Sequence, residues 1–314
     1  MLRSHDWLVC TVALICGIAP FAVNAQEMLT DHATEQDGPH FTTLDIFGRE
    51  IFAFPSINNR RMVTGTYLPI DAPLTGFVLL DRFLHPIAFE NWGNVTMLGN
   101  NDRGEIVGLT NTDLKEIAFR YTRGNVEDVS VPGANTTTAR DINNRGDMVG
   151  VLQINAVGHG YLLAGDQLTL IDGPDSDGTT RIFGTIVLGL NDKREVVGCY
   201  EPTDRLHARR GFVFRKGTYE IFLVPGANAT CTVGINNRGQ IVGSYTVPGD
   251  DRGHGFLFSK GRYVTMDIPN ARHTTITSIN DFGDIVGTYQ DESFVQRAFK
   301  SNVREFIARR NVQH

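Results

Sequence analysis

The sequence predicts an all-β protein, a six-bladed β-propeller with four-stranded blades, and two observations carry this prediction. A turn motif of the form Asn-Asn/Asp-x-Gly, followed by a short apolar strand that contains a glycine, recurs along the chain. Its copies are 42 to 48 residues apart, a period typical of propeller blades. Each repeat also contains a second tight turn, so that it divides into four short strands. The six strand glycines are Gly65, Gly108, Gly150, Gly198, Gly243 and Gly287.

Two other architectures remain as alternatives, a seven-bladed propeller and a β-solenoid. A solenoid turn would be shorter than this repeat and would not contain two tight hairpins. A series of separate hairpins is disfavoured because an isolated hairpin cannot bury an apolar face. Six copies of the motif favour six blades.

The copy around residues 230–268 shows the predicted blade most clearly. Its first hairpin turns at Asn236-Asn237-Arg238-Gly239, where Asn tolerates left-handed backbone and Gly adopts it at no steric cost. The glycine of the second strand indicates a close approach of another backbone. We designate the four strands a to d. Their expected ranges are Thr230–Ile235, Gln240–Thr246, Gly255–Phe258 and Tyr263–Ile268.

Two turns depart from the motif, because Arg61 and Arg194 stand where the other copies have glycine. If these turns keep the common geometry, each arginine adopts a positive φ at a cost of about 1 kcal/mol. Replacement of either arginine by glycine is then expected to stabilise the fold.

The chain starts in the middle of a repeat, which predicts how the ring closes. Residues 41–46 align without a gap onto residues 263–268, a d strand, and the same offset continues to residue 58. The segment 41–46 is therefore expected to complete the last blade. Val303–Arg309 also fits a d strand, so the sequence offers seven such strands for six blades.

The N-terminal region has the features of a secretory signal peptide. Leu2-Arg3 precedes an uncharged, mostly apolar run from Trp7 to Val23, which ends in Asn24-Ala25. We expect residues 1–25 to be a signal peptide, 26–40 a flexible lead-in and 41–314 a single six-repeat propeller domain. An N-terminal anchor helix is the alternative. After removal of the signal peptide, we expect the mature protein to be secreted or periplasmic.

Composition narrows the possible partners. The formal net charge is −6 and the isoelectric point about 5.8, which argue against a nucleic-acid partner. No second long apolar stretch follows the first, so no membrane span is expected in the mature chain. We expect a monomer that needs no cofactor, with Ca²⁺ as the one weak candidate.

The repeats resemble those of the bacterial extracellular HAF-repeat proteins. The resemblance rests on the turn motifs, on Phe41-Thr42-Thr43-Leu44-Asp45 and on two Val-Pro-Gly-Ala segments, at 131–134 and 224–227. It covers the whole mature chain. The His-Ala-Phe triplet of that family corresponds here to His159-Gly160-Tyr161 and His254-Gly255-Phe256. The resemblance implies a repeat fold and brings no catalytic residues.

Cys199 and Cys231 are the two cysteines that follow the predicted signal peptide. An exported protein meets an oxidising compartment, and neighbouring blades bring these positions near each other. The sequence therefore allows a disulfide, with two buried free thiols as the alternative.

One loop could hold a metal ion. Asp172, Asp175 and Asp177 place three carboxylates in a glycine-containing segment, and such oxygen ligands suit Ca²⁺. An exposed polar turn is the alternative. His159 and His254 recur in register at the start of strand c, so we interpret them as structural.

Antiparallel strands place the short a–b and c–d turns on one face of the disc and the variable b–c and d–a connections on the other. Binding sites favour variable loops on a rigid scaffold, so we expect the ligand on the b–c/d–a face. The b–c loops of blades four and five are long and charged. The candidate ligand contacts are Asp204, Arg205, His207, Arg209, Asp251 and Arg252.

These features predict a binding or interaction module for a polar ligand, such as a glycan, a peptide or an envelope protein. The alternative is a polysaccharide-active lyase or hydrolase that uses the same loops, with His207 as the catalytic base and Arg205 or Arg209 on a sugar carboxylate. The sequence contains no Gly-x-Ser-x-Gly, phosphate-loop or His-Glu-x-x-His motif, which favours the binding module.

Overall fold

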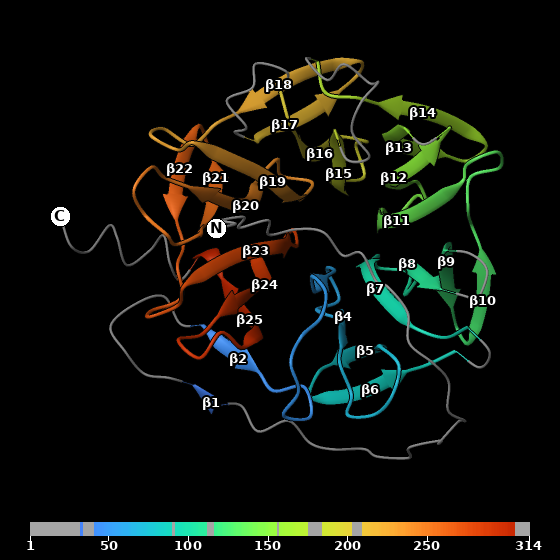
Figure 1. Cartoon of the computed structure of the whole chain (residues 1–314), viewed down its shortest axis with the longest axis horizontal. Coiled ribbons are helices and arrows are strands. Elements are labelled where there is room, and N and C mark those ends of the chain that lie inside the picture. Colours follow the sequence, from blue (N-terminus) through green and yellow to red (C-terminus); the bar gives the residue numbers. More distant parts are fainter. Residues whose placement is uncertain are drawn as a thin grey trace, which may run out of the picture.

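A computed structural model shows a six-bladed β-propeller, as predicted (Figure 1). It describes residues 32–33, 41–89, 92–111, 116–155, 157–174, 184–202 and 209–304. The predicted signal peptide lies outside these residues. Six antiparallel sheets surround a central axis, and five of them contain four strands each. No helix within the described ranges is long and apolar enough to cross a membrane.

Each blade begins with strand a at the axis and ends with strand d at the rim (Figure 1). Blade one consists of β3 (Ser56–Ile57), β4 (Val63–Tyr67), β5 (Thr75–Leu80) and β6 (Phe83–Ile87). Blade two consists of β7 (Val95–Asn100), β8 (Ile106–Asn111), β9 (Glu116–Thr122) and β10 (Asn125–Asp128). Blade three consists of β11 (Thr136–Ile142), β12 (Met148–Ile154), β13 (Val157–Ala164) and β14 (Gln167–Ile171). Blade four consists of β15 (Thr185–Leu190), β16 (Val196–Tyr200), β17 (Arg210–Arg215) and β18 (Thr218–Phe222). Blade five consists of β19 (Ala229–Ile235), β20 (Ile241–Thr246), β21 (His254–Ser259) and β22 (Arg262–Thr265).

Blade six joins the two ends of the described chain. Its first three strands are β23 (His273–Ile279), β24 (Asp284–Gln290) and β25 (Gln296–Asn302), and its fourth is the N-terminal β2 (Thr42–Leu44). β2 pairs with β25 in antiparallel register, with Thr43 opposite Phe299. β1 (His32–Ala33), from the predicted lead-in, adds a fifth strand outside β2.

The predicted closure by residues 41–46 is therefore confirmed, and the choice between the two candidate d strands is resolved. Val303 donates its N–H to Gly283 O, and Val303–Arg304 belong to no strand.

One pair of residues sets the packing within every blade. The glycine of strand b lies directly opposite an aromatic residue of strand c, and all six aromatic side chains are almost completely buried. In blade five, for example, Gly243 pairs with Phe256. The absence of a side chain on strand b leaves room for the ring, so the motif glycine and the aromatic residue form one packing unit. The six aromatic residues are Phe77, Phe119, Tyr161, Phe212, Phe256 and Phe299.

The same glycines allow a close backbone approach, as predicted. Strand a has a register shift in five blades, such as the one between Thr232 and Gly234 in β19. The shift brings a carbonyl oxygen of strand a against the strand b glycine. A Cβ atom on Gly243 would lie 2.0 Å from Cys231 O, a distance that no side chain tolerates.

Candidate functional site

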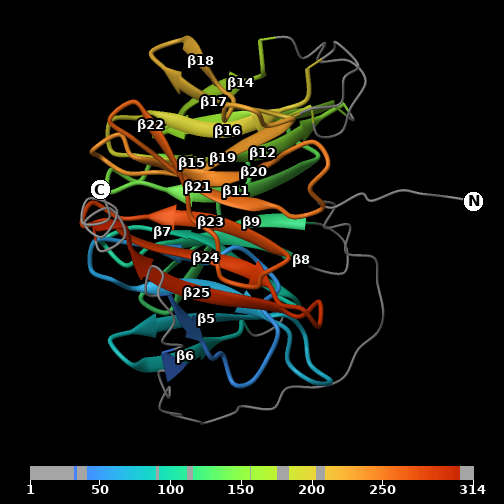
Figure 2. The ribbon, with the colours of Figure 1, turned by 90° about the vertical axis from the view of Figure 1, so that its left-hand side faces the viewer.

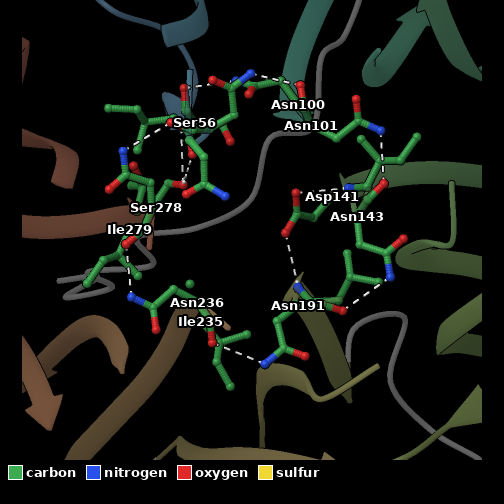
Figure 3. A pocket seen from close by; sticks show the side chains of 18 of the residues that line it. Ser56, Asn100, Asn101, Asp141, Asn143, Asn191, Ile235, Asn236, Ser278 and Ile279 are labelled. Carbon is green, nitrogen blue, oxygen red and sulfur yellow. Dashed lines mark hydrogen bonds between the residues drawn. The ribbon is translucent and has the colours of Figure 1, made fainter. Parts of the chain in front are cut away.

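The six innermost strands and their a–b turns line a central channel with a cavity of about 100 Å³ (Figure 3). Two rings of polar side chains from the a–b turns close around its mouth. We call them the inner Asn ring and the alternating ring. The inner Asn ring consists of Asn58, Asn101, Asn143, Asn191, Asn236 and Asn280. The alternating ring consists of Asn59, Asp102, Asn144, Asp192, Asn237 and Asp281.

The inner Asn ring is a closed cycle of hydrogen bonds from blade to blade. Each Nδ2 donates to the main-chain carbonyl of the next asparagine at 2.8 to 3.2 Å, and Asn280 returns to Asn58 O. Each Oδ1 accepts two main-chain N–H groups of its own turn, as Asn236 does from Arg238 and Gln240. The sequence predicted the turn role of these residues, and the structure adds the contacts between blades.

In the alternating ring, asparagine and aspartate residues alternate from blade to blade and form hydrogen bonds with their neighbours on both sides. Each member accepts at Oδ1 a main-chain N–H from the preceding blade, as Asp102 does from Asn59. Each asparagine Nδ2 donates to both neighbouring carboxylates, as Asn144 does to Asp102 and Asp192 at 2.8 and 3.1 Å. This pattern keeps every carboxylate between two amides and needs an even number of blades.

Asp141 lies on strand a of blade three, two residues before Asn143 of the inner Asn ring. It is the only ionisable residue among the six that occupy this position in the a strands. Blades two, four and five have glycine there, and blades one and six have serine. Its Oδ1 accepts the Ile142 N–H at 2.9 Å and its Oδ2 accepts the Leu190 N–H of blade four at 3.0 Å. Burial against the channel wall raises the pKa of Asp141 to about 7, although both hydrogen bonds act in the opposite direction. Asp141 therefore links blades three and four.

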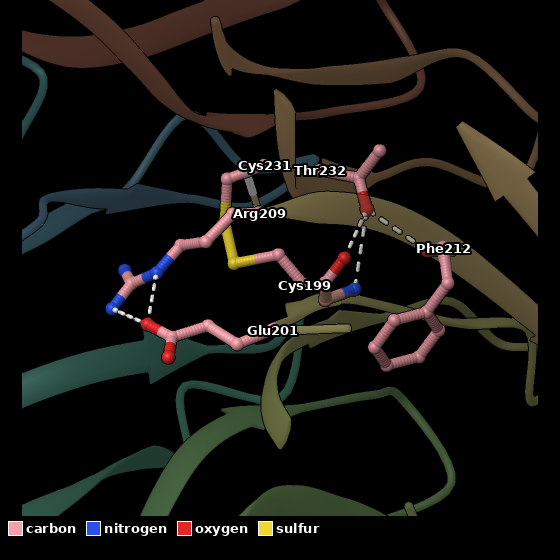
Figure 4. Close-up of a disulfide and its surroundings, with 7 residues drawn as sticks. Cys199, Glu201, Arg209, Phe212, Cys231 and Thr232 are labelled. Carbon is pink, nitrogen blue, oxygen red and sulfur yellow. Dashed lines mark hydrogen bonds and ion pairs between the residues drawn. A yellow bond between two sulfur atoms is a disulfide. The ribbon is translucent and has the colours of Figure 1, made fainter. Parts of the chain in front are cut away.

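The described part of the predicted ligand site consists of charged residues that pair within their own loops. Arg209 lies 3.3 Å from Glu201 (Figure 4). Arg252 pairs with Asp250 at 2.8 Å. Asp251 is exposed. The predicted contacts Asp204, Arg205 and His207 lie outside the described residues. The pairing holds Arg209 and Arg252 in fixed positions, while the Arg252 side chain remains 60% exposed.

The structure extends this sector toward blade six, which the sequence reasoning missed. Gly253, in the b–c loop of blade five, bridges to His273 and donates its N–H to Arg272 O. The Arg272 guanidinium lies 4.3 Å from the centre of the Phe294 ring, in the b–c loop of blade six. Phe294 is 58% exposed. These contacts place Arg252, Arg272 and an exposed aromatic ring along one edge of the b–c/d–a face.

Both repeated histidines are held by carboxylates. His254 Nδ1 lies 2.8 Å from Asp267 and its Nε2 lies 3.3 Å from Asp250, while its ring stacks on Tyr245. His159 Nδ1 lies 3.0 Å from Asp172. These contacts tie the start of strand c to the segment after strand d, which agrees with a structural role.

The calcium prediction involves Asp172, which contacts His159, together with Asp175 and Asp177, which lie outside the described residues. Within the described ranges, no group of three or more His, Cys, Asp and Glu side chains is placed to hold a metal ion.

The disulfide between Cys199 and Cys231 is present, so the alternative of two free thiols is wrong. It joins β16 of blade four to β19 of blade five, with the Cα atoms 5.0 Å apart (Figure 4). The loop that it closes has a sequence separation of 32, for which the chain-entropy model gives roughly 3 to 4 kcal/mol of stabilisation. Thr232, beside it, donates to Gly198 O and Phe212 O, so this boundary between blades is tightly connected.

The blades and rings define this chain as a six-bladed β-propeller. No protein-family model matches it, and no curated protein matches it. Among solved structures it is similar to a six-bladed fucose-binding lectin of Aleuria aurantia (11% identity, 80% of this chain and 93% of that one, TM-score 0.50). It is also similar to a mutant of AofleA from Arthrobotrys oligospora (13%, 85% and 88%, TM-score 0.51). A third similar structure is Trypanosoma rangeli sialidase (9%, TM-score 0.52), where the match covers 90% of this chain and 61% of the sialidase. At these identities the likeness shows the fold alone.

Proposed function

We propose that this protein is a secreted or periplasmic binding module that recognises a polar ligand, with a glycan as the leading class, on its b–c/d–a face. The observation that carries the proposal is the edge formed by the b–c loops of blades five and six and by the d–a connection between these blades. There Arg252 is held by Asp250 yet exposed, and Arg272 lies against the exposed ring of Phe294. Charged groups that are fixed before binding lose little conformational freedom when a ligand arrives.

The chemistry of this edge suits a ligand with hydroxyl or carboxylate groups. A guanidinium donates several hydrogen bonds in a fixed fork, which matches a carboxylate or a pair of hydroxyls. The exposed aromatic ring offers an apolar surface beside these donors. The fold is also one that the Aleuria aurantia lectin uses in fucose recognition, which supports a glycan as the first ligand class to test.

A glycan array probed with the full mature chain tests this function. We expect at least one bound class, and Arg252→Gln or Phe294→Ala should weaken its binding about tenfold, since truncation of an anchor residue typically costs more than 1 kcal/mol. Arg120→Gln is the matched control, because Arg120 lies on β9 of blade two, away from this edge, and pairs with Glu127. Unchanged affinity in both site variants would exclude this edge as the binding site.

Replacing residues 201–209 with the connection Leu109–Glu116 of blade two tests the part of the site that the sequence predicted in blade four. Loss of binding with an unchanged melting temperature would support that loop. The enzymatic alternative depends on His207. If the protein releases new reducing ends or unsaturated uronates from the bound glycan, and His207→Ala abolishes this release, the protein is an enzyme and not a binding module alone.

A further inference from the structure

The face opposite the proposed ligand site carries exposed charge of almost one sign. It is formed by the a–b and c–d turns, and we call it the basic face. The exposed acids of these turns are Asp81 and Asp166. The exposed cations are Arg60, Arg61, Arg82, Arg103, Arg123, Arg145, Lys193, Arg194, Lys216, Arg238 and Lys260. This distribution contrasts with the overall net charge of −6.

The other carboxylates of these turns are less exposed and are already engaged. Those of the alternating ring accept amide and main-chain hydrogen bonds around the axis. Asp147, Glu105 and Glu195 accept hydrogen bonds from the inner Asn ring. Negative charge therefore lies beneath the turns, and positive charge lies at their tips.

Several of these cations occupy backbone positions that disfavour them. Eleven described residues other than glycine have a positive φ, and five of these are cations. All five lie in turns of the basic face. They are Arg61, Arg123, Arg194, Lys216 and Lys260.

The c–d turns show that folding alone does not call for these cations. A two-residue hairpin with two positive φ angles favours Asn-Gly or Asp-Gly. Blades two, four and five instead have Arg123-Gly124, Lys216-Gly217 and Lys260-Gly261. None of these three cationic side chains has a hydrogen-bond or ion-pair partner among the described residues. Contacts among the described residues therefore do not account for the charge of these turns.

The channel mouth shows the same pattern. The third residue of each a–b turn is exposed, and in five blades it is Arg or Lys. Arg103 pairs with Glu105, whereas the side chains of Arg60, Arg145, Lys193 and Arg238 form no hydrogen bond or ion pair within the described part of the chain. In blade six this position is Phe282, which is 46% exposed. The mouth is thus surrounded by five exposed cations and one exposed aromatic ring.

We infer that the basic face docks onto an anionic lipid surface. The cations belong to five of the six blades and form two concentric sets, the a–b turns near the axis and the c–d turns near the rim. Both sets of turns lie on the same side of the disc, which Figure 2 shows edge-on. A linear polyanion would meet only a stripe of these charges, whereas a plane of phosphate headgroups meets them together. Each Arg or Lys near such a surface contributes to attraction, and Phe282 enters the headgroup region.

Co-sedimentation of the full mature chain with phosphatidylcholine vesicles, with and without phosphatidylglycerol, tests this inference. We expect binding only to the anionic vesicles, and a decrease as salt is raised. Arg145→Gln combined with Arg238→Gln should weaken binding about tenfold or more, since each cation near the surface contributes appreciably. Phe282→Ala should weaken it severalfold, including at high salt.

The matched control combines Arg49→Gln with Arg297→Gln, two exposed arginines of the opposite face, and should bind vesicles as the wild type does. Equal losses in both double variants would overturn the inference, because the effect would then follow net charge alone. So would tight binding of soluble polygalacturonate or duplex DNA without binding to anionic vesicles, since the face would then serve a dissolved polyanion.

Discussion

Arg61 and Arg194 hold the same position in the a–b turns of blades one and four, and each contacts the preceding blade. Their φ angles are +61° and +60°, the left-handed geometry that glycine adopts in the other four turns. Arg61 pairs with Asp284 of blade six at 3.0 Å, and Arg194 pairs with Asp147 of blade three at 2.9 Å. Both turns therefore keep the common geometry, but the ion pairs change the expectation that glycine at either position stabilises the fold. The ion pairs offset the strain of that geometry to different degrees.

The two pairs differ in burial, so substitution by glycine should have opposite effects. Asp147 is only 4% exposed, and Arg194→Gly would leave its carboxylate without its charged partner, at an expected loss of about 1 to 3 kcal/mol. Arg61 is 70% exposed, so its ion pair is worth little, and Arg61→Gly should be neutral or stabilise by up to about 1 kcal/mol. The two free energies of unfolding, measured in urea, decide this. Stabilisation by Arg194→Gly would contradict the role of the ion pair.

The Arg194 contribution should also depend on pH. Burial acts to raise the pKa of Asp147, but hydrogen bonds from Arg194 and Asn143 outweigh it and leave that pKa below its ordinary value. Stability from a depressed carboxyl pKa is present above the unfolded-state value near 4 and is lost as the pH falls through the folded-state value. The difference between wild type and Arg194→Gly should therefore shrink below about pH 4.

At the scale of the strand, the glycine of strand b and the aromatic residue of strand c act together. Gly243 faces Phe256 across the b–c pair, and a Cβ atom at Gly243 would also overlap Cys231 O. Neither the ring nor the carbonyl has room to move, because both lie in the closely packed interior of the blade. Packing thus explains why a glycine recurs on strand b of every repeat.

Gly243→Ala should destabilise the protein by more than about 3 kcal/mol, since overlap with backbone cannot be relieved by a side-chain rotation. Gly239→Ala is the matched control, because nothing lies within 4 Å of a Cβ atom there. Its cost should be limited to about 1 kcal/mol from the positive φ. Thermal unfolding of both variants provides the comparison, and an equal, small effect would show that the strand relaxes easily.

At the scale of the whole molecule, β2 and the rings of the a–b turns close the propeller. β2 is the fourth strand of blade six and covers the edge of β25, and Phe41 packs edge-on against Phe299 at 5.2 Å between ring centres. At the axis, the inner Asn ring and the alternating ring connect blade six to blade one through Asn280 and Asp281. The rim and the axis therefore close by different means.

Deletion of residues 1–46 should lower the melting temperature by several degrees and broaden the transition, because β25 would keep β24 but lose β2 on its other edge, while the axis stays closed. Deletion of residues 1–30 is the control, since it keeps β1 and β2, and it should leave the transition unchanged. If the longer deletion melts like the control, closure at the axis alone holds the ring.

The repeat period, the turn chemistry and the displaced start at Phe41 determined the fold, the number of blades and the closing strand, because each is a local pattern that the chain repeats. The Asn/Asp alternation in the second turn position was also visible in the sequence. The hydrogen bonds that this alternation makes could not be predicted, because those from Asn144 to Asp102 and Asp192 join residues 42 and 48 positions apart in the sequence. Only the closed ring decided these partners, the Cys199–Cys231 bond and the gathering of exposed cations on one face, because all three depend on which side of a blade a residue occupies.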